Sequence, residues 1–118
     1  MNSVRLEGVT KVYRLGSGEV HALRGVSLDI QEGELTAILG PSGSGKSSLL
    51  HIMGCVDAPT AGSVELAGKA VSGLGDRELT AIRRDMVGFV FQQFYLIPTL
   101  TAFENVLLPT LFLRRNGR

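Results

Sequence analysis

The sequence predicts a mixed α/β fold with a β-rich N-terminal region, and three observations support this prediction. Between residues 4 and 30, short runs alternate apolar and polar side chains, as half-buried strands do. Apolar runs at residues 35–39 and 87–91 are nearly continuous, which is typical of strands covered on both faces. Between these runs, apolar residues recur at helical spacing.

The N-terminal strands are separated by short segments rich in glycine, which favours antiparallel pairing. Alternating half-buried strands are expected at residues 4–9, 20–23, 26–30 and 63–67. Turns or loops are expected at residues 16–18, 32–34 and 57–62. The predicted order is therefore a β-rich opening, then a strand, a loop and a helix, then further β-structure, a helix, a strand and a helix.

Three helices are predicted from apolar spacing and capping residues. The first runs from Lys46 to about Cys55, because Leu49, Leu50 and Met53 share one face. Asp76 is expected to cap the second, which runs to Met86 with residues 79, 82 and 86 on one face. The segment Thr101-Ala102-Phe103-Glu104 matches a capping box and begins the third, which Pro109 ends or kinks.

Composition and charge exclude several classes of protein. Hydrophobic residues make up 44% and charged residues 19% of the chain, so a packed core is expected rather than disorder. The net charge of +1 lacks the basic footprint of a nucleic-acid-binding protein. The single cysteine, Cys55, lies in an apolar stretch and is expected to be buried rather than reactive. No apolar run is long enough to span a membrane, so any membrane role would come through a partner.

The segment from residue 40 to residue 47 fits the pattern G-x-x-x-x-G-K-[ST] at every fixed position. Glycines at positions 40, 43 and 45 let backbone N–H groups surround a triphosphate, and the following helix adds its positive dipole end. Lys46 is expected to reach the β- and γ-phosphates, and the Ser47 hydroxyl to ligate Mg²⁺. The predicted phosphate-binding residues are Gly40, Pro41, Ser42, Gly43, Ser44, Gly45, Lys46, Ser47 and Ser48.

From Val4 to about Pro109 the chain resembles the ATP-binding subunits of ABC transporters, most closely the lipoprotein-releasing and macrolide-export branch. The segments that carry this resemblance are residues 11–13, 22–28, 40–50, 57–62, 82–85, 87–94, 96–98 and 101–106. The resemblance implies the P-loop NTPase fold of ABC ATPases: a β-rich N-terminal subdomain, an incomplete parallel-sheet core and the start of a helical subdomain. Within a single domain, these parts are expected at residues 1–35, 36–92 and 93–118.

The resemblance also implies roles for individual residues. Tyr13 sits where the family places an aromatic side chain that stacks on adenine. Val20 either adds an apolar contact to adenine or is a plain strand residue. Gln92 is identified as the glutamine of the Q-loop, whose carbonyl oxygen contacts Mg²⁺ or a bridging water; only the resemblance favours it over Gln93. Lys46 and Gln92 are thus the candidate catalytic residues, and Ser47 and Gln92 the candidate metal ligands.

The implied ligands are ATP and Mg²⁺. The implied partners are a membrane-spanning permease and a second ATP-binding subunit that completes an ATP sandwich, with the protein peripheral on the cytoplasmic face of the membrane. The apolar residues 94–98 face the membrane subunit in the family, or else pack inside the helical part. We expect no chemical role for His21 or His51.

Three motifs of the family do not occur in these 118 residues: the signature loop, the strand ending in aspartate and glutamate, and the switch histidine. We therefore expect an N-terminal part of an ABC ATPase that ends soon after the Q-loop, and that alone binds ATP weakly and hydrolyses it negligibly. Missing later strands would leave apolar faces and edges uncovered. The alternatives are a nucleotide-binding regulatory module without turnover and another phosphate-loop enzyme such as a kinase or GTPase, against which Tyr13 and Gln92 argue.

Overall fold

The computed structural model describes residues 1–112, and it begins with a long β-hairpin. Strand β1 (Asn2–Leu15) pairs antiparallel with β2 (Gly18–Gln31), as the short connection predicts. Both strands are longer than expected: the short runs predicted at residues 20–23 and 26–30 are one strand. The pairing shifts register at several points, including between Leu6 and Val9. These irregularities interrupt the alternation of side chains, which is why the sequence pattern divided each strand into pieces.

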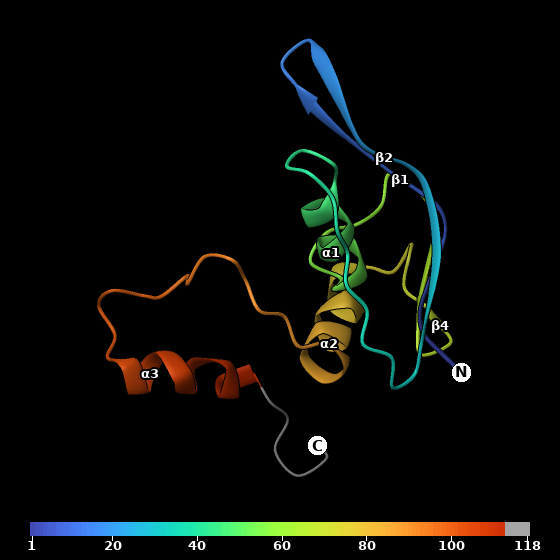
Figure 1. Ribbon diagram of the computed structural model, residues 1–118. Coiled ribbons are helices and arrows are strands. Elements are labelled where there is room, and N and C mark those ends of the chain that lie inside the picture. The colour runs from blue at the N-terminus through green and yellow to red at the C-terminus, as the bar shows by residue number, and fades with distance from the viewer. Residues whose placement is uncertain (113–118) are drawn as a thin grey trace.

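Two later strands complete the antiparallel sheet. Strand β3 (Ala61–Leu66) pairs with β1, and the short β4 (Lys69–Ala70) pairs with β3, giving the order β2-β1-β3-β4. The sheet therefore draws on residues well beyond the 1–35 region. Strand β2 forms one edge of the sheet, and Figure 1 shows the tip of the β1–β2 hairpin extending past the helices as a projecting arm.

Helices α1 (Lys46–Met53), α2 (Asp76–Met86) and α3 (Ala102–Leu107) lie where the sequence predicts them. Helix α1 ends two residues early, because Cys55 adopts a left-handed conformation with φ of 59°. Asp76 is the first helical residue of α2 and not its cap, since Gly75 occupies the N-cap and no side chain caps the helix. The capping box of Thr101 and Glu104 is confirmed, and beyond Leu107 the chain continues as a 3-10 helix, η1 (Leu108–Phe112).

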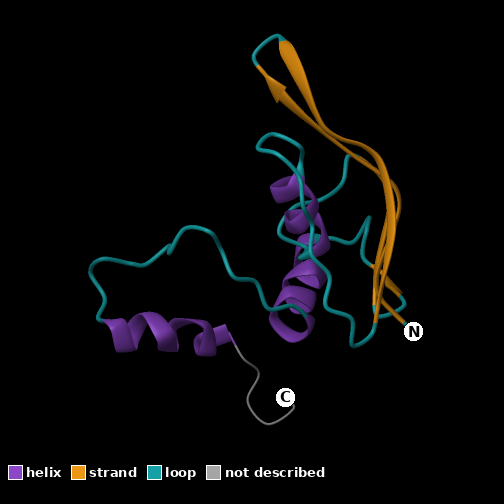
Figure 2. Cartoon of the chain, in the orientation of Figure 1, coloured by secondary structure: helices purple, strands orange, loops and turns teal. Residues whose placement is uncertain are grey.

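The core lies between the sheet and the helices α1 and α2, which Figure 2 shows on one side of the strands. Its buried residues come from both layers: Leu6, Val9, Leu23, Leu49, Ile52, Cys55, Val64, Leu66, Val71 and Ile82. Cys55 is buried as predicted, and desolvation raises the pKa of its thiol despite the opposing charge of Arg83. Helix α3 stands apart from this core on a long connecting segment (Figure 2).

The predicted strands at residues 35–39 and 87–91 do not form, and this expectation is corrected. Leu35, Leu39 and Val90 are at least 90% exposed, although their sequence is typical of strands covered on both faces. Such a strand needs hydrogen-bonding neighbours, and no segment of residues 1–112 pairs with either run. The exposed apolar runs do match the expectation that apolar faces would remain uncovered.

None of the helices within residues 1–112 is long and apolar enough to cross a membrane. Residues 113–118, which belong to the predicted 93–118 region, lie outside the described part of the chain.

Candidate functional site

The glycine-rich loop occupies the position between the exposed run at residues 35–39 and the start of α1. Gly43 and Gly45 have φ values of 80° and 94°, which side chains rarely adopt. Gly45 is the N-cap of α1 and offers no side chain to its first turn, which leaves the helix N-terminus open to an external acceptor. The ammonium of Lys46 donates a hydrogen bond to the carbonyl oxygen of Gly40, so this side chain folds back over the loop.

An open cleft of about 520 Å³ joins the loop to the hairpin arm. Tyr13 of β1 and Val20 of β2 line one side, and the loop and the first turn of α1 line the other. Gln92, which follows the second apolar run, completes the lining. These segments meet because the loop before α1 extends towards the projecting β1–β2 hairpin, as Figure 1 shows.

The structure gathers most of the predicted binding residues around this one cleft. Those that line it are Tyr13, Val20, Ser42, Gly43, Gly45, Lys46, Ser47, Ser48 and Gln92. Gly40, Pro41 and Ser44 do not line it and instead shape the loop from within, where the Ser44 N–H donates to the Pro41 carbonyl oxygen over 3.2 Å. His21 and Ala22 also line the cleft, and nothing in the sequence pattern distinguished them from ordinary strand residues.

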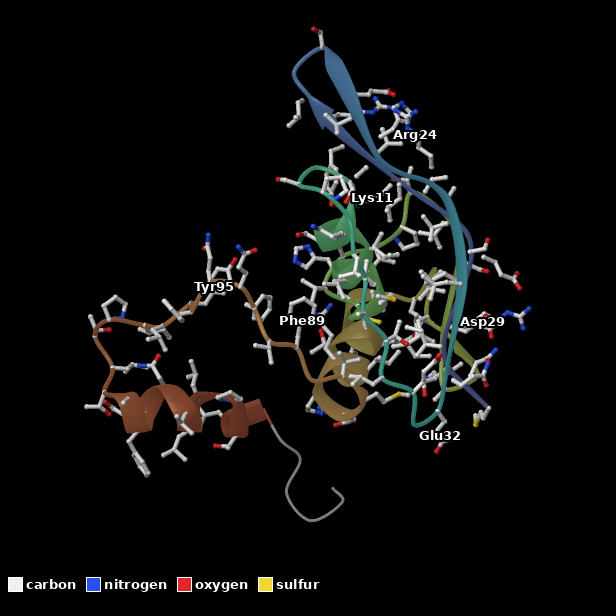
Figure 3. All side chains as sticks on the ribbon, in the orientation of Figure 1. Lys11, Arg24, Asp29, Glu32, Phe89 and Tyr95 are labelled. Atoms are coloured by element: carbon white, nitrogen blue, oxygen red, sulfur yellow. The ribbon has the colours of Figure 1, made fainter. Side chains whose placement is uncertain are left out.

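A neighbouring cleft of about 500 Å³ shares Ser47 and Gln92 with the first. Its wall is aromatic: Phe89 and Phe91 lie 4.5 Å apart between ring centroids, and Tyr95 meets Phe91 edge-on at 5.1 Å. Figure 3 shows Phe89 beside the helices and Tyr95 further along the same segment. Gln92 therefore sits between the two clefts and borders both.

The first cleft offers side-chain oxygen atoms, which is the ligand type that Mg²⁺ prefers. Ser47 offers a hydroxyl and Gln92 an amide carbonyl, and both side chains line the same cleft. Mg²⁺ prefers oxygen ligands and takes few of them from the protein when nucleotide phosphates supply the others. Within residues 1–112, no group of three or more His, Cys, Asp or Glu side chains is placed to hold a metal ion.

A polar network beneath Tyr13 was not predicted from the sequence. The Tyr13 hydroxyl lies 3.2 Å from both Ser48 Oγ and Asp57 Oδ2, and Lys11 Nζ lies 3.1 Å from Asp57 Oδ1. Asp57 stands in the turn after α1 and Lys11 stands on β1. Their separation of 46 positions along the chain left no local pattern to find them by.

The network has a consequence for stability at acid pH. Partial burial by itself would raise the pKa of Asp57. Hydrogen bonds from Lys11 and from the Ala58 N–H, with the Lys11 charge and the Tyr13 hydroxyl, lower that pKa below its ordinary value of 3.8. A carboxyl whose pKa is lower in the folded state stabilises the fold above its unfolded pKa, and this contribution is lost as the pH falls through the folded pKa.

Replacing Asp57 with asparagine should therefore destabilise the full-length protein at neutral pH and have a shrinking effect below pH 3.8. Melting temperatures of the wild type and Asp57→Asn, measured at a series of pH values, check this expectation. A difference between the two proteins that stays constant, or grows, down through this range would contradict it.

Comparison with known proteins finds similarity to ABC transporter ATP-binding proteins over most of this chain. A family profile described as ABC transporter matches residues 23–118. An uncharacterized ABC transporter ATP-binding protein of Methanocaldococcus jannaschii, MJ0796, is 54% identical over 114 residues, which cover 97% of this chain and 48% of that protein. Its dimeric structure in a post-hydrolysis state, bound to ADP and Pi, matches with a TM-score of 0.90 over 98% of this chain and 50% of that chain.

Two further relatives carry functional names. The lipoprotein-releasing system ATP-binding protein LolD of Ruegeria pomeroyi is 53% identical over 110 residues, which cover 92% of this chain and 48% of that protein. The macrolide export ATP-binding/permease protein MacB of Chlorobaculum tepidum is 48% identical over 114 residues, which cover 97% of this chain and 18% of that protein. The chain thus spans about half the length of the relatives from M. jannaschii and R. pomeroyi.

Proposed function

This chain belongs to the ABC transporter ATP-binding family, and from that premise we propose that it forms the nucleotide-binding half of an ATPase subunit. The observation that carries the proposal is the cleft shared by Tyr13, Lys46 and Gln92. It offers an aromatic side chain for a base, a glycine-rich loop with an ammonium for phosphates, and oxygen donors for a metal ion.

In this proposal different residues of the cleft bind the base, the phosphates and the metal ion of the nucleotide. Tyr13 stacks on the adenine, with Val20 beside it, and Lys46 exchanges its bond to the Gly40 carbonyl for the β- and γ-phosphates. Ser47 and Gln92 would hold Mg²⁺, which would supply positive charge to neutralise the phosphates. The Gln92 carbonyl oxygen would contact the metal ion or a bridging water, so Lys46 and Gln92 are the proposed catalytic residues of this chain.

The whole protein is proposed to hydrolyse ATP and to couple hydrolysis to transport by a membrane-spanning permease. The names of the LolD and MacB relatives support export or lipoprotein extraction, and the dimeric MJ0796 structure supports a partner ATP-binding subunit. The protein would then lie peripherally on the cytoplasmic face of the membrane. The 118 residues alone are proposed to bind ATP weakly and hydrolyse it negligibly, since they lack the acidic pair and signature loop on which phosphoryl transfer depends.

Tyr13→Ala in the full-length protein tests the nucleotide site. Loss of base stacking should weaken ATP binding about tenfold, because stacking on one aromatic side chain is worth roughly 1–3 kcal/mol. Titration of the wild type and the variant with ATP measures the effect, and titration of the wild type with GTP measures base preference. Phe103→Ala is the matched control, since Phe103 is an exposed aromatic residue of α3 that does not line the cleft. Unchanged ATP affinity in Tyr13→Ala, or a clear wild-type preference for GTP, would contradict adenine stacking on Tyr13.

A further inference from the structure

The side chain of Tyr13 is held in place by groups from three parts of the chain. Its hydroxyl lies 3.2 Å from Ser48 Oγ in α1 and donates to Asp57 Oδ2, also at 3.2 Å, in the turn after α1. The ammonium of Lys11 lies 5.1 Å from the centroid of its ring. These contacts hold the hydroxyl at the tip of the side chain and place a cation near the ring.

Asp57 is the centre of this arrangement because each carboxylate oxygen has a separate task. Oδ2 accepts from the Tyr13 hydroxyl, while Oδ1 accepts from Lys11 Nζ at 3.1 Å and from the Ala58 N–H at 2.8 Å. Lys11 also donates to the Ala58 carbonyl oxygen at 2.8 Å. The Lys11 side chain is only 14% exposed, so the ion pair with Asp57 is partly shielded from water.

Lys11 does not line the cleft that Tyr13 lines, although its ammonium lies 5.1 Å from the centroid of the Tyr13 ring. Figure 3 shows Lys11 where β1 passes the loop that precedes α1. A cation on one side of an aromatic ring is attracted to it and restricts its rotation. Tyr13 lines the cleft while the cation near its ring does not, so Lys11 does not take up the space that a ligand would enter.

The turn that carries Asp57 is itself fastened to β1. The Thr60 N–H donates to the Thr10 carbonyl oxygen at 2.8 Å, and the Val12 N–H donates to Thr60 Oγ1 at 2.9 Å. The segment that leaves the phosphate-side helix therefore holds the strand that presents Tyr13. The two sides of the cleft are connected through residues 57–60 as well as through Ser48.

We propose that Asp57, together with Lys11, is a positioning residue that holds Tyr13 at the angle required for stacking on a nucleotide base. The proposal rests on the nucleotide site proposed above and adds residues that determine affinity for the base. Stacking depends on the angle and separation of the rings, and a ring that is already ordered loses less rotational freedom on binding. Asp57 therefore contributes to the affinity for the base of ATP and does not contribute to the affinity for its phosphates.

The test compares two ligands in the full-length protein: ATP, and inorganic tripolyphosphate, which has phosphates and no base. Asp57→Asn removes the charge that holds Lys11, and Tyr13→Phe removes only the hydroxyl. Each variant should bind ATP about threefold to tenfold more weakly and bind tripolyphosphate as the wild type does. The double variant should be little weaker than either single variant, because both changes release the same ring.

Asp29→Asn is the matched control. Asp29 also faces a basic residue of β1, with 3.7 Å between its Oδ1 and Arg5 Nε, and Figure 3 shows it on the sheet away from Lys11. This variant should bind both ligands normally. If Asp57→Asn unfolds too readily for titration, Tyr13→Phe decides the question, because it removes a single oxygen atom.

Two outcomes overturn the inference. Equal weakening of ATP and tripolyphosphate in Asp57→Asn would mean that Asp57 supports the fold and not the base. Normal ATP affinity in Tyr13→Phe would mean that the hydroxyl contacts do not orient the ring. Failure of the proposed nucleotide site looks different, because then Tyr13→Ala also binds ATP normally.

Discussion

Replacing Lys46 with alanine should lower ATP turnover by the full-length protein about a hundredfold or more. Among residues 1–112, Lys46 is the lysine or arginine whose side chain lines the cleft beside the glycine-rich loop. Charge develops on the phosphate oxygens as the terminal phosphoryl group is transferred, and a positioned cation stabilises that charge. Alanine has no group that reaches the phosphates, and water in its place supplies no fixed charge.

The measurement is steady-state phosphate release, with ATP binding and melting temperature recorded in parallel. Melting temperature matters because Lys46 also donates to the Gly40 carbonyl and could contribute to the shape of the loop. Lys69→Ala is the matched control, since Lys69 lies exposed on the short strand β4. Normal turnover and ATP affinity in Lys46→Ala would reject the phosphate-binding assignment of the loop. Loss of turnover in both variants would indicate a general effect of lost positive charge.

The helices were predictable because their signals are local. Helix α2 has its apolar residues on one face, and Ile82 is buried as that pattern requires. The capping box at Thr101 is a pattern of four consecutive residues, and both of its hydrogen bonds form. The detail that failed was the cap of α2, where Asp76 is a favourable cap residue by type but Gly75 takes the position.

Strand formation depends on neighbours that a local pattern does not describe. The runs at residues 35–39 and 87–91 have the composition of buried strands, and Leu35 is nevertheless fully exposed. Conversely, β1 and β2 pair through segments that contain glycines and register shifts, where alternation is weak. Pairing partners, and not the apolar content of a segment, decide which runs become strands.

The candidate site likewise contains residues that the local sequence identifies and residues that only the folded chain brings together. The glycine-rich loop could be singled out from the sequence because its residues are consecutive and each has a reason for its type. Tyr13, Val20 and Gln92 came from resemblance, and the cleft that borders all three is consistent with that assignment. Between Lys11 and Asp57 lie the end of β1, the whole of β2, the glycine-rich loop and α1, so only the folded chain brings them together at Tyr13.

Gly45→Ala should destabilise the full-length protein by about 2–5 kcal/mol and weaken binding of ATP as well. Gly45 has a φ of 94°, which strains any residue with a Cβ atom. An added Cβ would also lie 2.5 Å from the Ala22 carbonyl oxygen of β2 and 3.2 Å from Leu23 Cδ2. Because the obstacle at Ala22 is backbone, either β2 or the start of α1 must move.

Gly43→Ala is the matched control, because it separates conformational strain from this close approach. Gly43 has a φ of 80°, but a Cβ at this position would meet nothing within 4 Å. Strain alone should therefore cost about 1–2 kcal/mol at Gly43, less than at Gly45. Urea unfolding curves of the two variants measure the difference. Equal losses would show that contact between the loop and β2 adds nothing. A larger loss at Gly45 would show that the base side and the phosphate side of the cleft are held together by direct backbone packing.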